Sequence, residues 1–322
     1  MTKHKSLKKK GNVLLSLQKG DVVDLIAPAS GFSEEEYKSC IRFVESLGLK
    51  PRVVPYKKLV NPKEAFCSNT ADFRLENLAD ALSSDSKAIW CIAGGYGSYQ
   101  LLEGLEKIPM PKKQKLFIGF SDITVLLNYF VENWGWACIY GTTLLQIARK
   151  KVSKKAISSI KKLIFNDESS LVIKKIEVLN KTYKKSAEGI LVGGCMSLLQ
   201  SLIGTPQDIN LTGKILLLED DRFETPGRMS RIFNHMVRAG VFDKVEAVVL
   251  GSTLEQSQVV DKDEAQKLAK ALEYLKKELD KRKKILIKVV DIGHSVDMIS
   301  VPLGTKAKIK LGNSPEFIIE IN

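Results

Sequence analysis

The feature that most constrains the fold is an alternation, in the first half of the chain, of short apolar runs with amphipathic stretches. The first apolar run, residues 21–28, predicts a strand. The stretch that follows begins with Ser33 and Glu36, which have the spacing of a helix capping box. Strands and helices that alternate in this way form a mainly parallel sheet covered by helices on both faces. Further strands are expected at 50–55, 88–92 and 116–119, and further helices at 73–82, 98–105 and 123–133.

The second half of the chain alternates again after a less regular region. Residues 149–188 are rich in Lys and Ser and weakly periodic, which favours a connection between two domains. A length of 322 residues also exceeds the usual size of one domain. We therefore expect an α/β protein with an N-terminal domain at 11–150, a connecting segment at 151–186 and a C-terminal domain at 187–322. In the latter, helices are expected at 196–202, 228–239 and 264–280, and strands at 214–218, 247–251 and 285–290, before a β-rich tail at 307–321.

The composition is typical of a soluble globular protein, with 44% hydrophobic and 27% charged residues. No apolar run reaches the ~18 residues that a membrane-spanning helix needs, and residues 1–17 are too interrupted for a secretory signal. A cytoplasmic location without membrane association is therefore expected. The five cysteines form no CxxC pair and mostly lie in apolar runs, which predicts reduced, buried thiols: Cys40, Cys67, Cys91, Cys138 and Cys195.

The net charge of +13 could indicate nucleic acid or an anionic small molecule as a partner. The excess is mostly lysine and is scattered over 3–10, 149–162, 174–185 and 276–284, without interleaved aromatics or a known nucleic-acid signature. A solvated cationic surface explains it better, so no nucleic-acid partner is expected. The sequence indicates no role for the basic N-terminal tail.

Three strand ends carry the parts of a Ser/His/Glu relay. Ser121, Glu219 and His294 each come directly or shortly after an apolar run that predicts a strand. Of the two other histidines, His4 lies in the basic tail and His235 lies inside a predicted helix. No His or Cys near His294 has a metal-ligand spacing, so neither a metal ion nor a cofactor is expected.

Ser121 lies where a buried strand gives way to a helix. A tight turn there can expose the hydroxyl while the amide of Asp122 stabilises an oxyanion, as in a nucleophile elbow. The motif is not G-x-S-x-G, because Ile123 takes the place of the final Gly. On this segment alone, an ordinary helix N-cap is the simpler explanation of Ser121.

Two further segments admit both a functional and a structural interpretation. The turn that contains Gly94 and Gly95 can direct backbone amides at an anion, but it lacks dinucleotide and P-loop spacings and can equally be a tight turn without ligand. Glu219 begins an acidic cluster at a strand's carboxyl end, where ligands of α/β sheets gather. It can orient an imidazole, although on its own the segment favours a solvated turn or a helix cap.

Five short motifs occur in order along most of the chain, between about Gly20 and Leu311. They are Gly94-Gly95-Tyr96-Gly97, residues 118–124, Gly193-Gly194 with Gly204-Thr205-Pro206, Leu218-Glu219-Asp220, and Gly293-His294 with Pro302-Leu303-Gly304. This succession resembles the LD-carboxypeptidase family of serine peptidases, which comprises muramoyltetrapeptide carboxypeptidases and a branch of microcin-immunity peptidases.

The resemblance implies an N-terminal flavodoxin-like, glutamine-amidotransferase-like domain and a C-terminal swivelling β/β/α domain, with the active site between them. It further implies that family members are homodimers. Residue by residue, it implies Ser121 as nucleophile, Glu219 as orienting acid and His294 as base. The amides of Asp122 and of a glycine in the Gly94-Gly95 turn correspond to the oxyanion hole.

The implied reaction is acyl transfer on a small anionic peptide, the murein tetrapeptide, cut between the L-centre of its diamino acid and the terminal D-Ala during cytoplasmic peptidoglycan recycling. The chain departs from the family where Arg, Asn, Tyr, Asp and Pro are common, namely at Ala93, Cys195, Gly227, Ser230 and Thr142. These positions leave the three triad residues intact, so the reaction class follows more directly than the identity of the peptide.

Two alternative functions remain open. A microcin-immunity-like peptidase, which cleaves an amide in a peptidyl-nucleotide, calls for an aromatic residue in the connecting segment to stack on the base. That segment offers only Phe165 and Tyr183. A non-catalytic peptide-binding relative is the other alternative, against which the intact triad residues argue.

Overall fold

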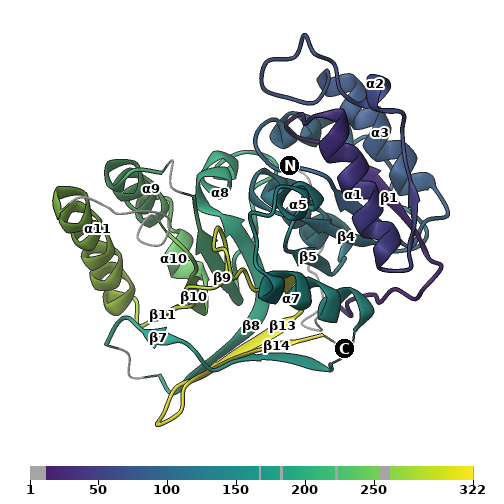
Figure 1. Ribbon diagram of the computed structural model, residues 1–322. Coiled ribbons are helices and arrows are strands. Elements are labelled where there is room, and N and C mark those ends of the chain that lie inside the picture. Colours follow the sequence, from purple (N-terminus) through teal and green to yellow (C-terminus); the bar gives the residue numbers. More distant parts are fainter. Residues whose placement is uncertain (1–11, 167, 182–183, 222–223, 254–261, 322) are drawn as a thin grey trace.

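The computed structural model describes residues 12–321 except 167, 182–183, 222–223 and 254–261. These residues form two lobes, each built on its own β-sheet (Figure 1). The first sheet has six strands in the order β12-β5-β4-β3-β1-β2, and the second has eight in the order β6-β14-β13-β8-β9-β10-β11-β7. The expected mixed α/β, two-domain class is confirmed.

The first sheet is parallel apart from one edge strand. Its parallel strands are β1 (Val22–Ile26), β2 (Lys50–Arg52), β3 (Ala88–Cys91), β4 (Leu116–Gly119) and β5 (Cys138–Tyr140). Their order, 2-1-3-4-5, is that of flavodoxin-like sheets, in which ligands bind where the order reverses, between the carboxyl ends of β1 and β3. The exception, β12 (Val301–Leu303), comes from late in the chain and pairs antiparallel with β5.

Helices cover this sheet, and they begin where the sequence provides caps. The predicted capping box is confirmed at α1 (Glu34–Ser46), where Ser33 and Glu36 bond reciprocally to each other's backbone N–H. The expected helix at 123–133 instead changes at Phe130 into a π-turn, in which the ring of Phe130 stacks on that of Trp134. The other elements are α2 (Tyr56–Leu59), α3 (Ala71–Ser83), a 3₁₀ turn (Ser98–Leu101), α4 (Leu102–Leu105), α5 (Thr124–Tyr129) and α6 (Leu144–Ala148).

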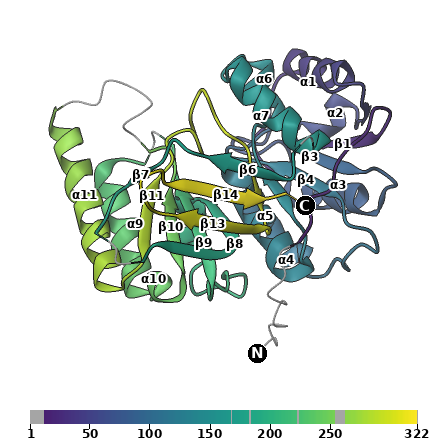
Figure 2. The ribbon, with the colours of Figure 1, turned by 90° about the horizontal axis from the view of Figure 1, so that it is seen from below.

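The second sheet combines a parallel half with an antiparallel half. The parallel strands are β8 (Ser186–Cys195), β9 (Lys214–Glu219), β10 (Ala247–Leu250) and β11 (Ile285–Lys288), and β13 (Lys306–Lys310) and β14 (Glu316–Glu320) form the predicted β-rich tail. In both ribbon views α9 and α11 lie side by side over the parallel half (Figure 2). The helices of this lobe are α8 (Met196–Leu202), α9 (Pro226–Arg238), α10 (Val241–Lys244) and α11 (Lys262–Lys281).

Residues 151–186, expected as a connecting segment, are folded over much of their length. Helix α7 (Lys154–Phe165) packs one apolar face against the hydrophobic core, with Ile160, Leu163 and Ile164 in the core of the first lobe. Strands β6 (Ser170–Ile173) and β7 (Glu177–Val178) form the edges of the second sheet. The buried face has the helical spacing i, i+4, i+7, i+8, which the surrounding Lys and Ser residues obscure in the sequence: Ala156, Ile160, Leu163 and Ile164.

The larger hydrophobic core extends through both lobes. It joins Phe117 and Leu126 of the first lobe to Leu191 and Leu217 of the second without interruption. All five cysteines are buried and unpaired, as predicted. None of the helices in the described part of the chain combines the length and the hydrophobicity needed to span a bilayer.

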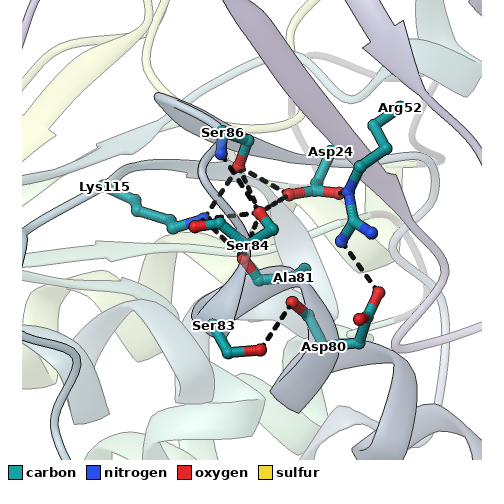
Figure 3. A network of polar contacts seen from close by, with 8 residues as sticks. All are labelled: Asp24, Arg52, Asp80, Ala81, Ser83, Ser84, Ser86 and Lys115. Carbon is teal, nitrogen blue, oxygen red and sulfur yellow. Dashed lines mark hydrogen bonds and ion pairs between the residues drawn. The ribbon is translucent and has the colours of Figure 1, made fainter.

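A buried polar cluster, which we call the Lys115 network, lies in the first lobe (Figure 3). Lys115 and Ser86 come just before β4 and β3, so the network lies toward the amino ends of these strands. The ammonium of Lys115 donates to the hydroxyls of Ser84 and Ser86 and to the carbonyls of Ala81 and Ser84, at 2.7–2.9 Å. Both hydroxyls donate to Asp24, which also pairs with Arg52.

Candidate active site

A pocket of about 360 Å³ opens where the carboxyl edges of the two sheets face each other. Loops that follow β1, β3, β4 and β5 supply one wall, and loops that follow β9 and β11 supply the other: Ser30, Gly94, Ser121 and Thr143 face Asp221 and His294. A larger hollow, of about 1100 Å³, lies near Lys214 at the amino end of β9 and contains none of the predicted site residues. The predicted site residues Ser121, His294, Gly94 and Gly95 line the smaller pocket instead.

Ser121 lies in a tight turn, and its backbone has an unusual conformation. Its φ is 59°, a left-handed value that costs a non-glycine residue energy and is found where the surrounding structure imposes it. Ser121 begins a 3₁₀ turn (Ser121–Ile123) for which Phe120 is the N-cap residue, so the N-cap explanation of Ser121 is wrong. Its Oγ instead lies 3.1 Å from Nε2 of His294.

His294 connects Ser121 to Glu219. Its Nδ1 lies 2.8 Å from Oε2 of Glu219, and its backbone N–H donates to the same oxygen at 3.0 Å. With Nδ1 protonated and bonded to the carboxylate, Nε2 is free to accept the proton of Ser121. This approach needs Gly293, whose φ is 107° and where a Cβ would lie 2.3 Å from Oε2 of Glu219.

The environment of His294 favours its protonated form. Burial opposes the charge, but the negative charge and hydrogen bond of Glu219 outweigh it, and the pKa of His294 is raised above 6.5. The ring of Phe120 packs against the imidazole with a centroid distance of 4.5 Å and limits its rotation. The side chain stays 19% exposed, toward the pocket. His294 is thus held in place while its Nε2 remains accessible.

Glu219 is completely buried, and its carboxylate is held from both lobes. One oxygen accepts the two bonds from His294, and the other accepts a short hydrogen bond from the hydroxyl of Tyr140. Tyr140 is the last residue of β5, in the first sheet, whereas Glu219 ends β9 in the second. Tyr140 was not predicted from the sequence, although it lies at the carboxyl end of a strand, as Glu219 does and Ser121 nearly does.

Further buried hydrogen bonds fasten the segment after Ser121 to the second lobe. The side chain of Asn128 both donates to and accepts from the backbone of Gly193, at 2.9 Å in each case. The hydroxyl of Thr124 accepts from the N–H of Cys195 at 3.1 Å and donates to the carbonyl of Ser121 at 2.6 Å. These bonds fix the position of the Ser121 turn relative to β8.

Both halves of the chain match known protein domains. The sequence model of the LD-carboxypeptidase N-terminal domain matches residues 23–141, and that of the LD-carboxypeptidase C-terminal domain matches residues 188–309. A probable murein peptide carboxypeptidase of Bacillus subtilis is 30% identical over 294 residues, which cover 91% of this chain and 89% of the relative. This chain belongs to the LD-carboxypeptidase family. It is therefore a member of a peptidase family, as the motifs indicated.

Other relatives place both branches of the LD-carboxypeptidase family near this chain. A putative carboxypeptidase of Rickettsia conorii is 30% identical over 71% of this chain and 72% of its own length. The microcin C7 self-immunity protein of Escherichia coli is 25% identical over 91% of both chains. Among solved structures, a muramoyltetrapeptide carboxypeptidase from Oxalobacter formigenes has a TM-score of 0.78 at 22% identity and covers 93% of this chain and 98% of its own, which shows the shared fold.

The Gly94-Gly95 turn packs directly against the Ser121 turn in this family member. A Cβ on Gly94 would lie 3.1 Å from the Cβ of Ser121 and 3.5 Å from the amide nitrogen of Asp122. The carboxylate of Asp122 is buried and accepts from the N–H of Ser98 at 2.8 Å. The two segments expected to supply oxyanion amides are therefore neighbours, and the Asp122 side chain points into the protein.

The positions that depart from the family pattern lie in different surroundings. Ala93 lines the pocket, whereas Gly227 is exposed and Ser230 half-buried on α9. The thiol of Cys195 lies 3.2 Å from Oδ1 of Asp220. Burial, together with the charge of neighbouring Glu219, raises the pKa of Asp220 to about 6.

Two cationic side chains in the pocket were not singled out from the sequence. Arg149 and Lys151 both line it, just beyond the end of α6. They belong to the scattered lysine and arginine excess that the sequence presents as a solvated surface. Only the folded chain shows that these two share a pocket with Ser121 and His294.

Proposed function

We propose that this chain is a serine-type carboxypeptidase that hydrolyses the bond between the L-centre of a murein tetrapeptide and its terminal D-Ala. The observation that carries the proposal is the hydrogen-bonded chain Glu219–His294–Ser121, which ends with the serine hydroxyl in a pocket. Relatives named murein tetrapeptide carboxypeptidase, in Pseudomonas aeruginosa, and probable murein peptide carboxypeptidase, in Bacillus subtilis, support the substrate class.

In the proposed acylation step, Nε2 of His294 removes the proton of Ser121 as Oγ attacks the carbonyl carbon of the L-residue. The buried carboxylate of Glu219 holds the required tautomer and stabilises the imidazolium that forms. The amide of Asp122 and one from the Gly94-Gly95 turn would stabilise the oxyanion. His294 then gives its proton to the leaving amine of D-Ala.

Deacylation repeats the same transfers with water as the nucleophile. His294 takes a proton from water as the oxygen attacks the ester of Ser121, and it returns the proton to Oγ when the ester bond breaks. Serine, imidazole and carboxylate together supply every proton transfer, so the proposed mechanism is metal-independent. We further propose that the enzyme acts as a homodimer in cytoplasmic peptidoglycan recycling.

The test uses two synthetic tetrapeptides that differ only in a terminal D- or L-Ala, with products measured by mass spectrometry. Release of D-Ala alone supports the proposal, and release of L-Ala alone contradicts it. A fluorophosphonate label separates an enzyme from a non-catalytic peptide-binding relative, because an activated serine reacts covalently. Folded protein that stays unlabelled at Ser121 would favour the binding protein.

One observation favours a microcin-immunity-like peptidase as a second candidate. Phe66, Tyr96 and Tyr99 form an exposed aromatic cluster, with centroid distances of 5.5 and 5.8 Å, and Ser30 of the pocket bonds to the backbone of Phe66 and Tyr96. Such rings can stack on a nucleobase. Of the aromatics in the connecting segment, Phe165 packs against the core and Tyr183 lies outside the described residues.

A direct competition between substrates decides between the two candidates. The tetrapeptide and a glutamyl sulfamoyl nucleoside, the kind of ligand seen in one solved relative, are offered at equal concentration. The proposed function predicts faster hydrolysis of the tetrapeptide. Faster turnover of the nucleoside, lost in Tyr96→Ala, would favour the second candidate.

A further inference from the structure

We propose that Arg149 and Lys151 bind the terminal carboxylate of the peptide and thereby make the enzyme a carboxypeptidase. The inference rests on the proposed function and deepens it by assigning the group that recognises the free chain end. A carboxypeptidase must distinguish a terminal residue from an internal one, and the only chemical difference next to the scissile bond is a carboxylate in place of an amide. A cationic site in the catalytic pocket supplies that distinction.

The backbone after α6 directs both side chains to the same wall of the pocket. Arg149 is the C-cap residue of α6, and Lys150 has a left-handed φ of 55° that reverses the chain. The N–H of Lys151 then bonds back to the carbonyl of Gln146 at 2.9 Å. Two cationic residues separated by one position thus reach the pocket that also contains Ser121.

Arg149 is held in position by a contact that leaves part of its guanidinium for a ligand. Its Nε donates to Glu36 at 2.6 Å, and this interaction lowers the pKa of Glu36 to about 2. Within the described parts of the chain, the hydrogen bonds of the guanidinium involve Nε alone. The two Nη groups can therefore donate a parallel pair of hydrogen bonds to a carboxylate.

The ion pair with Glu36 offsets the positive charge of Arg149. Lys151 therefore gives this wall of the pocket its net positive charge. No ion pair of Lys151 occurs among the residues that the structure describes, and its side chain is exposed. Asp221 lies on the opposite wall. A substrate carboxylate is attracted to the wall formed by Arg149 and Lys151, which favours one direction of the peptide across Ser121.

The experiment measures kcat and KM for the tetrapeptide and for the same peptide with a C-terminal carboxamide. We expect the wild-type enzyme to prefer the free acid. Arg149→Lys, which keeps the charge but loses the fork, and Arg149→Met should each lose about 10- to 100-fold in kcat/KM for the acid, mainly through KM, since a charge-assisted hydrogen bond contributes roughly 1.5–3 kcal/mol. Lys151→Met should lose about 3- to 10-fold, because the ammonium is exposed.

The carboxamide peptide should be cleaved equally by the wild type and the variants, and Lys161→Met, at an exposed position on α7, should behave as wild type. Equal losses for the acid and the amide would overturn the assignment. A third peptide with lysine in place of the diamino acid lacks the side-chain carboxylate. If the variants' losses disappear with that peptide, the site binds the side-chain carboxylate and the inference is wrong.

Failure of the proposed function has a different signature. In that case the wild type releases no D-Ala from any of the peptides, and the inference fails with it. If the wild type cleaves acid and amide equally well, the proposed function stands and only the inference fails.

Discussion

The protein contains two buried polar networks that use similar chemical groups for different ends. The Ser121–His294–Glu219 chain lies between the carboxyl edges of the two sheets, whereas the Lys115 network lies inside the first lobe near the amino ends of its strands (Figure 3). In the first, the cation-forming group touches a carboxylate directly. In the second, the hydroxyls of Ser84 and Ser86 separate Lys115 from Asp24.

This difference is reflected in the proton affinities of the two groups. The pKa of Lys115 is lowered to about 8 because burial disfavours the ammonium more than the relayed charge of Asp24 favours it. The pKa of His294 is raised, because Glu219 in direct contact outweighs the same penalty. The direct contact suits the proposed role of His294 as a base that gains and loses a proton, whereas Lys115 donates to the carbonyls of Ala81 and Ser84.

The largest expected effect is that of Ser121→Ala on activity. Without the hydroxyl no acyl-enzyme forms, and kcat should fall by about 10⁵- to 10⁶-fold. The unfolding temperature should change little, because the left-handed turn strains serine and alanine similarly. Ser39→Ala, at a half-buried position on α1, is the matched control. Near-native turnover of Ser121→Ala would remove the distinction between the two networks.

Glu219→Gln should have the next largest effect, about a 10⁴-fold loss in kcat. The amide keeps the volume of the buried side chain but no longer stabilises the imidazolium or fixes its tautomer. Steady-state kinetics beside Ser121→Ala gives the ratio of the two losses. A loss equal to that of Ser121→Ala would indicate a role of Glu219 beyond orienting His294.

Lys115→Met should have the opposite profile, with a loss of stability and full activity. The carbonyls of Ala81 and Ser84 lose their buried donor, and the free energy of unfolding should fall by about 2–3 kcal/mol. Urea unfolding measures the change, and kcat/KM should stay within twofold of wild type. Lys87→Met, at an exposed position nearby, should change stability by less than about 0.5 kcal/mol. A large loss of activity in Lys115→Met would show that the two networks are coupled.

Tyr140→Phe should give the smallest effect, about a tenfold loss in kcat/KM, because one hydrogen bond to a charged group is removed. The pH profile is the sharper measurement. In the wild type, kcat/KM should rise as His294 loses its proton, with a midpoint above 6.5. In the variant the carboxylate of Glu219 loses a donor and attracts the imidazolium more strongly, so the midpoint should move to higher pH.

A purely structural role of Tyr140 predicts an unchanged midpoint. The matched control is Tyr129→Phe, another buried tyrosine of the first lobe. Among the described residues its hydroxyl makes only a long contact of 3.5 Å, to the carbonyl of Leu105. This control should leave both the rate and the pH profile as they are.

The sequence predicts which strand-end residues come together better than it predicts long-range strand pairing. Ser121, Glu219 and His294 could be found because parallel strands present their carboxyl ends at one edge, so residues after apolar runs lie together. Tyr140 could not be distinguished, since nothing local to a three-residue strand indicates a partner 79 positions away. Arg149 and Lys151 were hidden among other cations, because charge alone does not show which side chains face a pocket.

Two long-range features of the fold escaped prediction for a related reason. Strand β12 pairs with β5 only because the chain after His294 crosses back to the first sheet, and a three-residue apolar segment carries no sign of this. Helix α7 had a periodic apolar face, but its lysines and serines suggested a connection between domains. Both features depend on pairing and packing over long sequence separations, which local patterns do not determine.

The return of the chain to β5 has a consequence for how the protein can be divided. The loop that bears His294 is anchored at one end in the second sheet by β11 and at the other end in the first sheet by β12. The first sheet is therefore completed by a strand from late in the chain. A fragment that stops before residue 301 leaves β5 as an unprotected edge, open to pairing with other chains. Rotation of one lobe against the other would strain the pairing of β11 in the second sheet and of β12 in the first. These pairings therefore resist separation of the His294 imidazole from Ser121.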